Sequence, residues 1–249
     1  MSYLVSELAS GAYVIAVEDN DTWDVASYTN LYVLKREKQI ILIDAGLERY
    51  QAAIIEALAK IGVTPDAVTH VLLTHGHRDH AEGANLFVHA RKFVHAFDFP
   101  FLDVRLASKF LPFTPQPGET LLTAQGVEDI EITLVDTHTP GSVVLYDRIS
   151  KAMFVGDFFC YFGEALPERE LVAYSDATRK GSCHYVAGQA AGGGDEFNRF
   201  MLGLSKLLAY QPEFFCTGHG IVLRGEIQAF IDSLWKSGVN SRSDEKNNE

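Results

Sequence analysis

The first quarter of the chain contains short runs of branched and aromatic residues, the pattern that is typical of β-strands. These runs cover residues 12–17, 31–35 and 39–43, and a charged triplet at 36–38 separates the last two. The triplet predicts a hairpin turn. Apolar residues at helical spacing over 54–61 then predict an amphipathic helix.

The middle of the chain predicts more strands around one unusual segment. Residues 97–117 contain five phenylalanines and four prolines, which favours an irregular aromatic flap, with local core packing as the simpler interpretation. A helix is expected over 81–87. Strands are expected over 67–73, 92–96, 119–122, 130–135, 143–146 and 152–155.

The C-terminal part shows weaker periodicity at first. Residues 161–194 lack a clear period and end in three glycines, so we expect a long loop there. An amphipathic helix over 197–208, a short strand over 213–216 and a helix over 227–234 follow. No internal linker divides the chain. We therefore expect one domain over 1–237 and a polar, disordered tail over 238–249.

Composition and charge restrict the partners of the protein. The 249 residues are 47% apolar and 22% charged, with a formal net charge of -12, which is the balance of a folded globular protein. The acidic surplus gives little attraction for a phosphate backbone or an anionic membrane. A small-molecule substrate is expected, and neither nucleic acid nor a membrane is expected as a partner.

The cysteines and the N-terminus bear on the compartment. Cys160, Cys183 and Cys216 are an odd number without CxxC spacing, so neither a disulfide framework nor a thiolate zinc cluster is indicated. The first residues lack the basic and apolar regions of a secretory signal, and no apolar run is long enough for a membrane span. These features predict a cytoplasmic protein.

One segment of the chain concentrates metal-binding side chains. His75, His77, Asp79 and His80 fall within six positions directly after an apolar strand. Neutral imidazole and carboxylate groups bind zinc, iron or manganese. A rigid strand end that holds four such groups together predicts a metal site.

This segment resembles the HxHxDH motif of the metallo-β-lactamase superfamily. The resemblance extends to the LIDAG sequence that ends the first hairpin, to His138 in DTHTPGS, to Asp157 in VGD and to His219 in GHG. It implies an α/β fold, a four-layer αβ/βα sandwich with two mixed β-sheets packed face to face and helices outside. All seven ligand positions of the family are filled: His75, His77, Asp79, His80, His138, Asp157 and His219.

The resemblance also implies how these residues are used. Two divalent metal ions are expected, zinc first, with iron or manganese as alternatives. His75, His77 and His138 would hold the first ion, Asp79, His80 and His219 the second, and Asp157 would bridge both. Asp44 matches a position that orients the ligand loop.

The chemistry implied by such a binuclear centre is hydrolysis. A metal-bridging hydroxide would cleave an ester, lactone or thioester bond of a small, largely apolar substrate, and Asp79 would move a proton to the leaving group. Lactonases and glyoxalase II-like enzymes are the nearest branches. Tyr161 is a candidate carbonyl-binding residue, with aromatic packing as the alternative. A glutathione thioester, a β-lactam and a nucleic acid are less favoured substrates.

An alternative function also stays open at this point, that of an iron-dependent oxidoreductase. The sulfur dioxygenases of the superfamily begin with the same HxHxDH motif. Flavodiiron reductases are less favoured, because they carry a glutamate where His77 stands and use an additional flavin domain. The phenylalanine-rich flap at 97–113 and the loop at 161–194 are expected to form walls or a lid of the substrate site. The same flap could instead form a homodimer contact.

Overall fold

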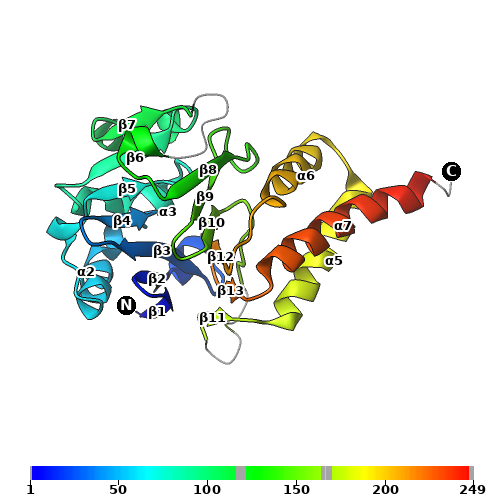
Figure 1. The fold of residues 1–249 in the computed structure, drawn as a ribbon, viewed down its shortest axis with the longest axis horizontal. Coiled ribbons are helices and arrows are strands. Elements are labelled where there is room, and N and C mark those ends of the chain that lie inside the picture. The colour runs from blue at the N-terminus through cyan, green and yellow to red at the C-terminus, as the bar shows by residue number, and fades with distance from the viewer. Residues whose placement is uncertain (1, 116–121, 164–165, 167–169, 247–249) are drawn as a thin grey trace.

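Two β-sheets lie face to face in the structure, and the larger helices cover their outer faces (Figure 1). The structure is a computed structural model, and it describes residues 2–115, 122–163, 166 and 170–246. The first sheet is built by the N-terminal half of the chain and the second sheet by the C-terminal half. This arrangement confirms the predicted α/β sandwich.

The first sheet contains seven strands in sequential order. Strands β1 to β4 pair antiparallel, whereas β4 to β7 pair parallel, so the sheet is mixed. The strands are β1 (Tyr3–Ala9), β2 (Ala12–Glu18), β3 (Tyr28–Lys35), β4 (Ile40–Ile43), β5 (His70–Leu72), β6 (Arg91–His95) and β7 (Phe110–Phe113).

The second sheet contains six strands in the order β11-β13-β12-β10-β9-β8. Strand β10 pairs antiparallel with β9 and parallel with β12, so this sheet is mixed as well. The strands are β8 (Ile130–Leu134), β9 (Val143–Asp147), β10 (Ala152–Gly156), β11 (Val172–Ala173), β12 (Phe214–Thr217) and β13 (Val222–Arg224).

The α-helices divide between the two sheets. Helix α2 packs on the first sheet, and α5, α6 and α7 pack on the second. The α-helices are α1 (Asn20–Trp23), α2 (Gln51–Lys60), α3 (Arg78–Ala81), α4 (Val104–Ala107), α5 (Asp176–Gly192), α6 (Asp195–Leu207) and α7 (Ile227–Lys246). Short 3₁₀ helices cover Glu48–Tyr50, Pro65–Ala67, Glu82–Leu86, Phe99–Phe101 and Thr123–Gln125.

The alternation of side chains along a strand produces the layers. In β2, Ala12, Val14 and Ala16 are buried between the two sheets, whereas Ile15 and Val17 are buried on the outer face with α2. Both faces of a strand inside a four-layer sandwich are covered, which explains why the central strands are almost continuously apolar. The sandwich therefore has one core between the sheets and one under each layer of helices.

The predicted long loop over 161–194 is wrong, because α5 occupies Asp176–Gly192. The buried face of α5 is formed by Arg179, Ser182, Val186 and Ala190. These positions have helical spacing, but two of them are polar, so the hydrophobic pattern is weak. The Arg179 guanidinium is satisfied by the backbone oxygens of Tyr174, Arg224 and Gly225.

The predicted flap over 97–117 is only partly irregular. Residues 110–113 form β7, which pairs parallel with β6 and buries Phe110 and Phe113 in the core. Pro112 is compatible with this strand because β7 is an edge strand among the described residues. Phe97 and Phe101 remain exposed, so only the first part of the segment is an aromatic surface.

The C-terminal tail and the strand before β8 are two further sequence predictions to compare with the structure. Helix α7 continues to Lys246, so residues 238–246, predicted to be disordered, are helical, whereas 247–249 lie outside the described residues. The strand predicted over 119–122 also falls outside them, except for Leu122. Four strands were not predicted from the sequence: β1, β7, β11 and β13. Over the described residues, no helix has the length and apolarity that a membrane crossing requires.

Phe154 tests the core between the sheets. Its side chain on β10 is completely buried, and its ring centroid lies 4.9 Å from that of Tyr32 on the facing sheet. Phe154→Ala should lower the free energy of unfolding by about 3–5 kcal/mol, because it removes apolar burial and leaves a cavity. Leu202→Ala is the matched control, since Leu202 is 60% exposed on α6 and should cost less than about 1 kcal/mol. Urea unfolding measures both, and equal losses would contradict the assignment of this core.

Candidate metal centre

The candidate ligands lie where several strands of both sheets end. His75 follows β5, Asp157 directly follows β10, and His219 lies just beyond β12. β10 and β12 run parallel, so their carboxyl ends meet at one edge of the second sheet. His138 lies in the connection between β8 and β9. Rigid strand ends from two facing sheets thus place the side chains in one space.

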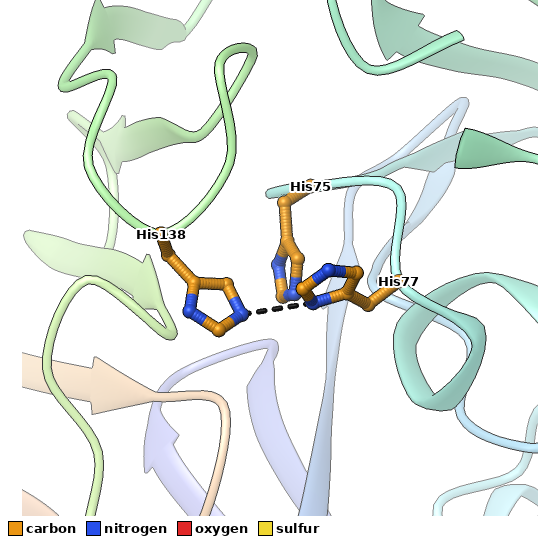
Figure 2. A group of neighbouring side chains, drawn as sticks. All are labelled: His75, His77 and His138. Carbon is orange, nitrogen blue, oxygen red and sulfur yellow. Dashed lines mark hydrogen bonds between the residues drawn. The ribbon is translucent and has the colours of Figure 1, made fainter. Parts of the chain in front are cut away.

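Three histidines form the first group of candidate ligands. His75, His77 and His138 each place a ring nitrogen within 4.8 Å of those of the other two. Figure 2 shows the three rings turned toward one another, with His75 and His77 on one loop and His138 on another. His77 Nδ1 and His138 Nε2 are 2.9 Å apart and share a hydrogen bond.

Two carboxylates and two histidines form the second group, and all its donor atoms lie within 4.8 Å of one another. His219 Nε2 is 3.1 Å from Asp79 Oδ2, and His80 Nε2 is 3.3 Å from Asp157 Oδ1. Asp157 Oδ2 is also 3.5 Å from His138 Nε2, so its carboxylate lies between the two groups. The structure therefore brings together all seven residues that the sequence predicts.

Burial and charge keep part of the first group neutral. Burial lowers the pKa of His75 well below its usual value, and the neighbouring His80 lowers it further. Burial also lowers the pKa of His138, because it outweighs the opposing attraction of Asp157, and the neighbouring His77 adds a smaller lowering effect. Neutral imidazole is the form that binds a metal ion.

The carboxylates and imidazoles of the second group shift one another's pKa values. Burial would raise the pKa of Asp79 and Asp157, but the nearby imidazoles of His80 and His219 hold both values well below the usual range. Burial would conversely lower the pKa of His80 and His219, but the two carboxylates raise both values. The carboxylates are therefore charged at neutral pH, which is the state that binds divalent cations.

Several buried donor atoms of the cluster have no hydrogen bond of normal geometry among the described residues. They are His75 Nε2, Asp79 Oδ2, His80 Nε2 and Asp157 Oδ1. Buried polar atoms are normally satisfied, and an orphaned set that points into one space needs an explanation. The donor set fits divalent metal ions, and it is common to zinc, iron and manganese.

Asp44 occupies the orienting position that the sequence predicts. Its Oδ1 accepts a hydrogen bond from the Thr74 N–H at 2.8 Å, and its Oδ2 accepts one from the Thr74 hydroxyl at 2.8 Å. Asp44 Oδ2 also lies 2.9 Å from His80 Nδ1. The proton on His80 Nδ1 is fixed by this contact, and Nε2 is left to face the second group.

The residues that hold the His219 turn were not predicted from the sequence. Asn30 Nδ2 donates to the backbone oxygens of Thr217 and Gly220, and the Tyr32 hydroxyl donates to Thr217 O. These bonds connect β3 of the first sheet to the turn after β12 of the second. The available signal in the sequence was a polar Asn30 directly before the apolar run 31–34, and the structure buries its side chain completely.

The segment after Asp157 contains Tyr161, for which the sequence suggested either carbonyl binding or aromatic packing. The Tyr161 ring is buried in the core under α5, and its hydroxyl lies 3.3 Å from Ser182 Oγ. Phe162 instead packs against His219 in a tilted arrangement with a centroid distance of 4.2 Å. Burial and the Asp157 carboxylate raise the pKa of the Cys160 thiol far above its usual range. A carbonyl-binding role for Tyr161 stays a prediction.

Comparison with known proteins gives a family match over most of the chain. The sequence model described as the Metallo-beta-lactamase superfamily matches residues 25–219. A probable metallo-hydrolase of Bacillus subtilis is 30% identical over 143 residues, which cover 51% of this chain and 60% of that protein. A metallo-beta-lactamase domain-containing protein of Xenopus laevis is 29% identical over 122 residues, 48% of this chain and 49% of that protein. The chain thus covers less than two thirds of the length of these relatives.

Solved structures share the fold at low sequence identity. A flavoprotein of Thermotoga maritima superposes with a TM-score of 0.73 at 18% identity, covering 94% of this chain and 60% of that one. A fragment of a putative diflavin flavoprotein of Nostoc superposes with a TM-score of 0.71 at 15% identity and covers 98% of each chain. At such identities the likeness establishes the fold alone.

Gly218 tests how tightly the second group is enclosed. A Cβ atom at Gly218 would lie 2.2 Å from Asp157 Oδ1 and 2.7 Å from His80 Cε1. Gly218→Ala should therefore displace these donors and weaken zinc binding by about tenfold or more, the scale of changes that disturb ligand orientation. Gly188→Ala on α5 is the matched control, because a Cβ atom there meets open space. Zinc titration of both variants measures the effect, and equal affinities would contradict the geometry.

Proposed function

The chain belongs to the metallo-beta-lactamase superfamily, and from that premise we propose that it is a metal-dependent hydrolase. The proposed reaction is cleavage of an ester, lactone or thioester bond in a small, largely apolar substrate. Two divalent ions, zinc first, are the proposed cofactors. His75, His77 and His138 would hold one, and Asp79, His80 and His219 the other, with Asp157 shared.

One observation carries the proposal. Seven imidazole and carboxylate groups from both sheets converge in two adjacent groups, and Asp157 reaches both of them. Burying charged and polar donors so closely costs free energy unless a cation compensates. Without a bound cation, this cost in free energy would not be offset. This supports metal binding as the reason for the arrangement.

The roles proposed for the protein's own groups follow from their environment. A pair of divalent ions, when bound, supplies activation of water and stabilisation of charge at a carbonyl. Asp79 stays a carboxylate at neutral pH, because its neighbours hold its pKa low, and its side chain is 10% exposed. It can accept a proton from the attacking water and pass it to the leaving group. The side chain of His138 is 34% exposed, so the first group faces the solvent side.

Two exposed aromatic rings support a largely apolar substrate. Phe101 contacts His77 edge to face with a centroid distance of 6.0 Å, and it is 46% exposed. Phe162 packs against His219 in a tilted arrangement and is 36% exposed. One ring thus lies beside each ligand group, where it can bury an apolar substituent and exclude water from the reacting bond.

Metal analysis combined with a substrate panel tests the proposal. Purified protein should contain up to two metal equivalents and should hydrolyse members of a panel of lactones, thioesters and aryl esters. His77→Ala and Asp157→Ala should each lower the metal content and reduce hydrolysis by about two orders of magnitude or more. His184→Ala and Asp66→Ala are matched controls, because both side chains are exposed and lie outside the two groups.

The outcome separates hydrolysis from the iron-dependent alternative. Hydrolysis that persists in both ligand variants would contradict the proposed site. Absence of hydrolysis, together with oxygen uptake by iron-loaded protein in the presence of a persulfide, would replace the proposal with the sulfur dioxygenase-like function.

A further inference from the structure

Asp98 is a buried carboxylate that the sequence analysis did not single out. It lies three residues beyond β6 and has no solvent-exposed surface. Its Oδ2 accepts hydrogen bonds from the Gly76 N–H at 2.8 Å and from the Thr139 hydroxyl at 2.6 Å. Its Oδ1 accepts one from the Gly141 N–H at 2.6 Å. Three donors therefore converge on one carboxylate.

These donors come from two loops that belong to different sheets. Gly76 stands between His75 and His77 in the loop after β5, and Thr139 directly follows His138 in the loop between β8 and β9. A single carboxylate thus contacts each loop one residue away from a candidate ligand. The three histidines of the first group are the residues that these two loops supply.

The packing around Asp98 leaves little freedom for either loop. A Cβ atom at Gly76 would lie 2.7 Å from Asp98 O, and one at Gly141 would lie 2.7 Å from Asp98 N and Oδ1. Both positions therefore require glycine. Thr139 is held a second time, because its N–H donates to Ser142 Oγ at 2.8 Å. These contacts account for Thr139, Gly141 and Ser142 in the TPGS sequence after His138.

Asp98 and Asp44 contact different parts of the ligand loops. Asp44 contacts His80 of the second group directly, and it reaches His75 only through the Thr74 hydroxyl, which lies 3.1 Å from His75 Nδ1. Asp98 contacts Gly76, Thr139 and Gly141, so it acts on the loops of the first group. Both are carboxylates that accept hydrogen bonds from a ligand loop, but neither supplies a donor atom to the groups that could hold a metal.

We propose that Asp98 is a positioning residue that sets the distance between the His75 and His77 loop and the His138 loop, and thereby controls metal binding at the three-histidine group. This inference rests on the proposed metal-dependent function. Its physical basis is that three donors face one acceptor. An amide in place of the carboxylate would turn an NH₂ group toward one of these donors and break the connection between the two sheets.

The test is a cobalt titration of the metal-free full chain followed by visible absorption. Cobalt in His and carboxylate sites absorbs in the visible range, so the absorbance follows each binding step. In the wild type we expect two binding steps, and His77→Ala identifies the step that belongs to the three-histidine group. Asp98→Asn should weaken that step by about 10–100-fold and leave the other within about twofold. Asp44→Asn should weaken the step of the second group, because Asp44 contacts His80, and through Thr74 it also reaches His75.

Matched variants separate positioning from general stability. Asp147→Asn replaces another completely buried carboxylate, which accepts hydrogen bonds from Arg36 and Ser150 at the end of β9. It should lower stability and change neither cobalt step. Thr139→Val removes one donor to Asp98 and should weaken the three-histidine step alone. Thr139→Ser keeps the hydroxyl and should bind cobalt at that step as the wild type does. The threonine pair decides the question if Asp98→Asn does not fold.

Each result points to one conclusion. Equal weakening of both steps in Asp98→Asn, or no change in either step, would overturn the positioning role. A wild-type protein that binds no cobalt would instead overturn the proposed function itself, because the two groups would then not be metal sites.

Discussion

The structure depends on one constraint, which is that imidazole and carboxylate donors are buried together. In two of the histidines, one ring nitrogen is held by a neighbouring oxygen and the other points toward the carboxylates. His80 Nδ1 is held by Asp44, and His219 Nδ1 contacts the backbone oxygen of Tyr28. The opposite ring nitrogens are thereby directed toward Asp79 and Asp157. The imidazole nitrogens and carboxylate oxygens that face one another there are donors that a divalent cation would satisfy together.

The sandwich supplies the rigidity that this convergence needs. The ligand loops of both sheets leave from the ends of short, buried strands, and they are joined by bonds that cross between the sheets. Asn30 and Tyr32 of the first sheet hold the turn before His219, and Val143 N–H donates to Thr74 O. Asp98 adds a third connection between the sheets. The fold is therefore a frame in which the position of each ligand depends on both sheets.

Much of the candidate site could be predicted from the sequence because its ligands occur in short motifs. His75 to His80 stand in one turn after an apolar strand, and Asp157 and His219 each follow another strand. Asp98 could not be found in this way, because its partners are mostly backbone N–H groups from loops distant in the sequence. The direction of the Tyr161 side chain was equally inaccessible, since it depends on the packing of α5.

The fold could be predicted from the sequence to a similar degree. The elements that were missed were missed for a similar reason. The alternating strands and amphipathic helices around the two sheets were identified from their periodicity. Helix α5 was missed because Arg179 and Ser182 occupy its buried face and satisfy their polar atoms against backbone oxygens. β7 was missed because Pro112 is unusual in a strand and is tolerated at an edge. Periodicity reveals burial only where the buried side chains are apolar.

The most direct measurement of the central claim is anomalous X-ray diffraction from crystals grown with zinc, collected on both sides of the zinc absorption edge. The account predicts two anomalous peaks, one among His75, His77 and His138 and one among Asp79, His80 and His219, with Asp157 between them. Crystals that diffract well and show no peak at either group would contradict it.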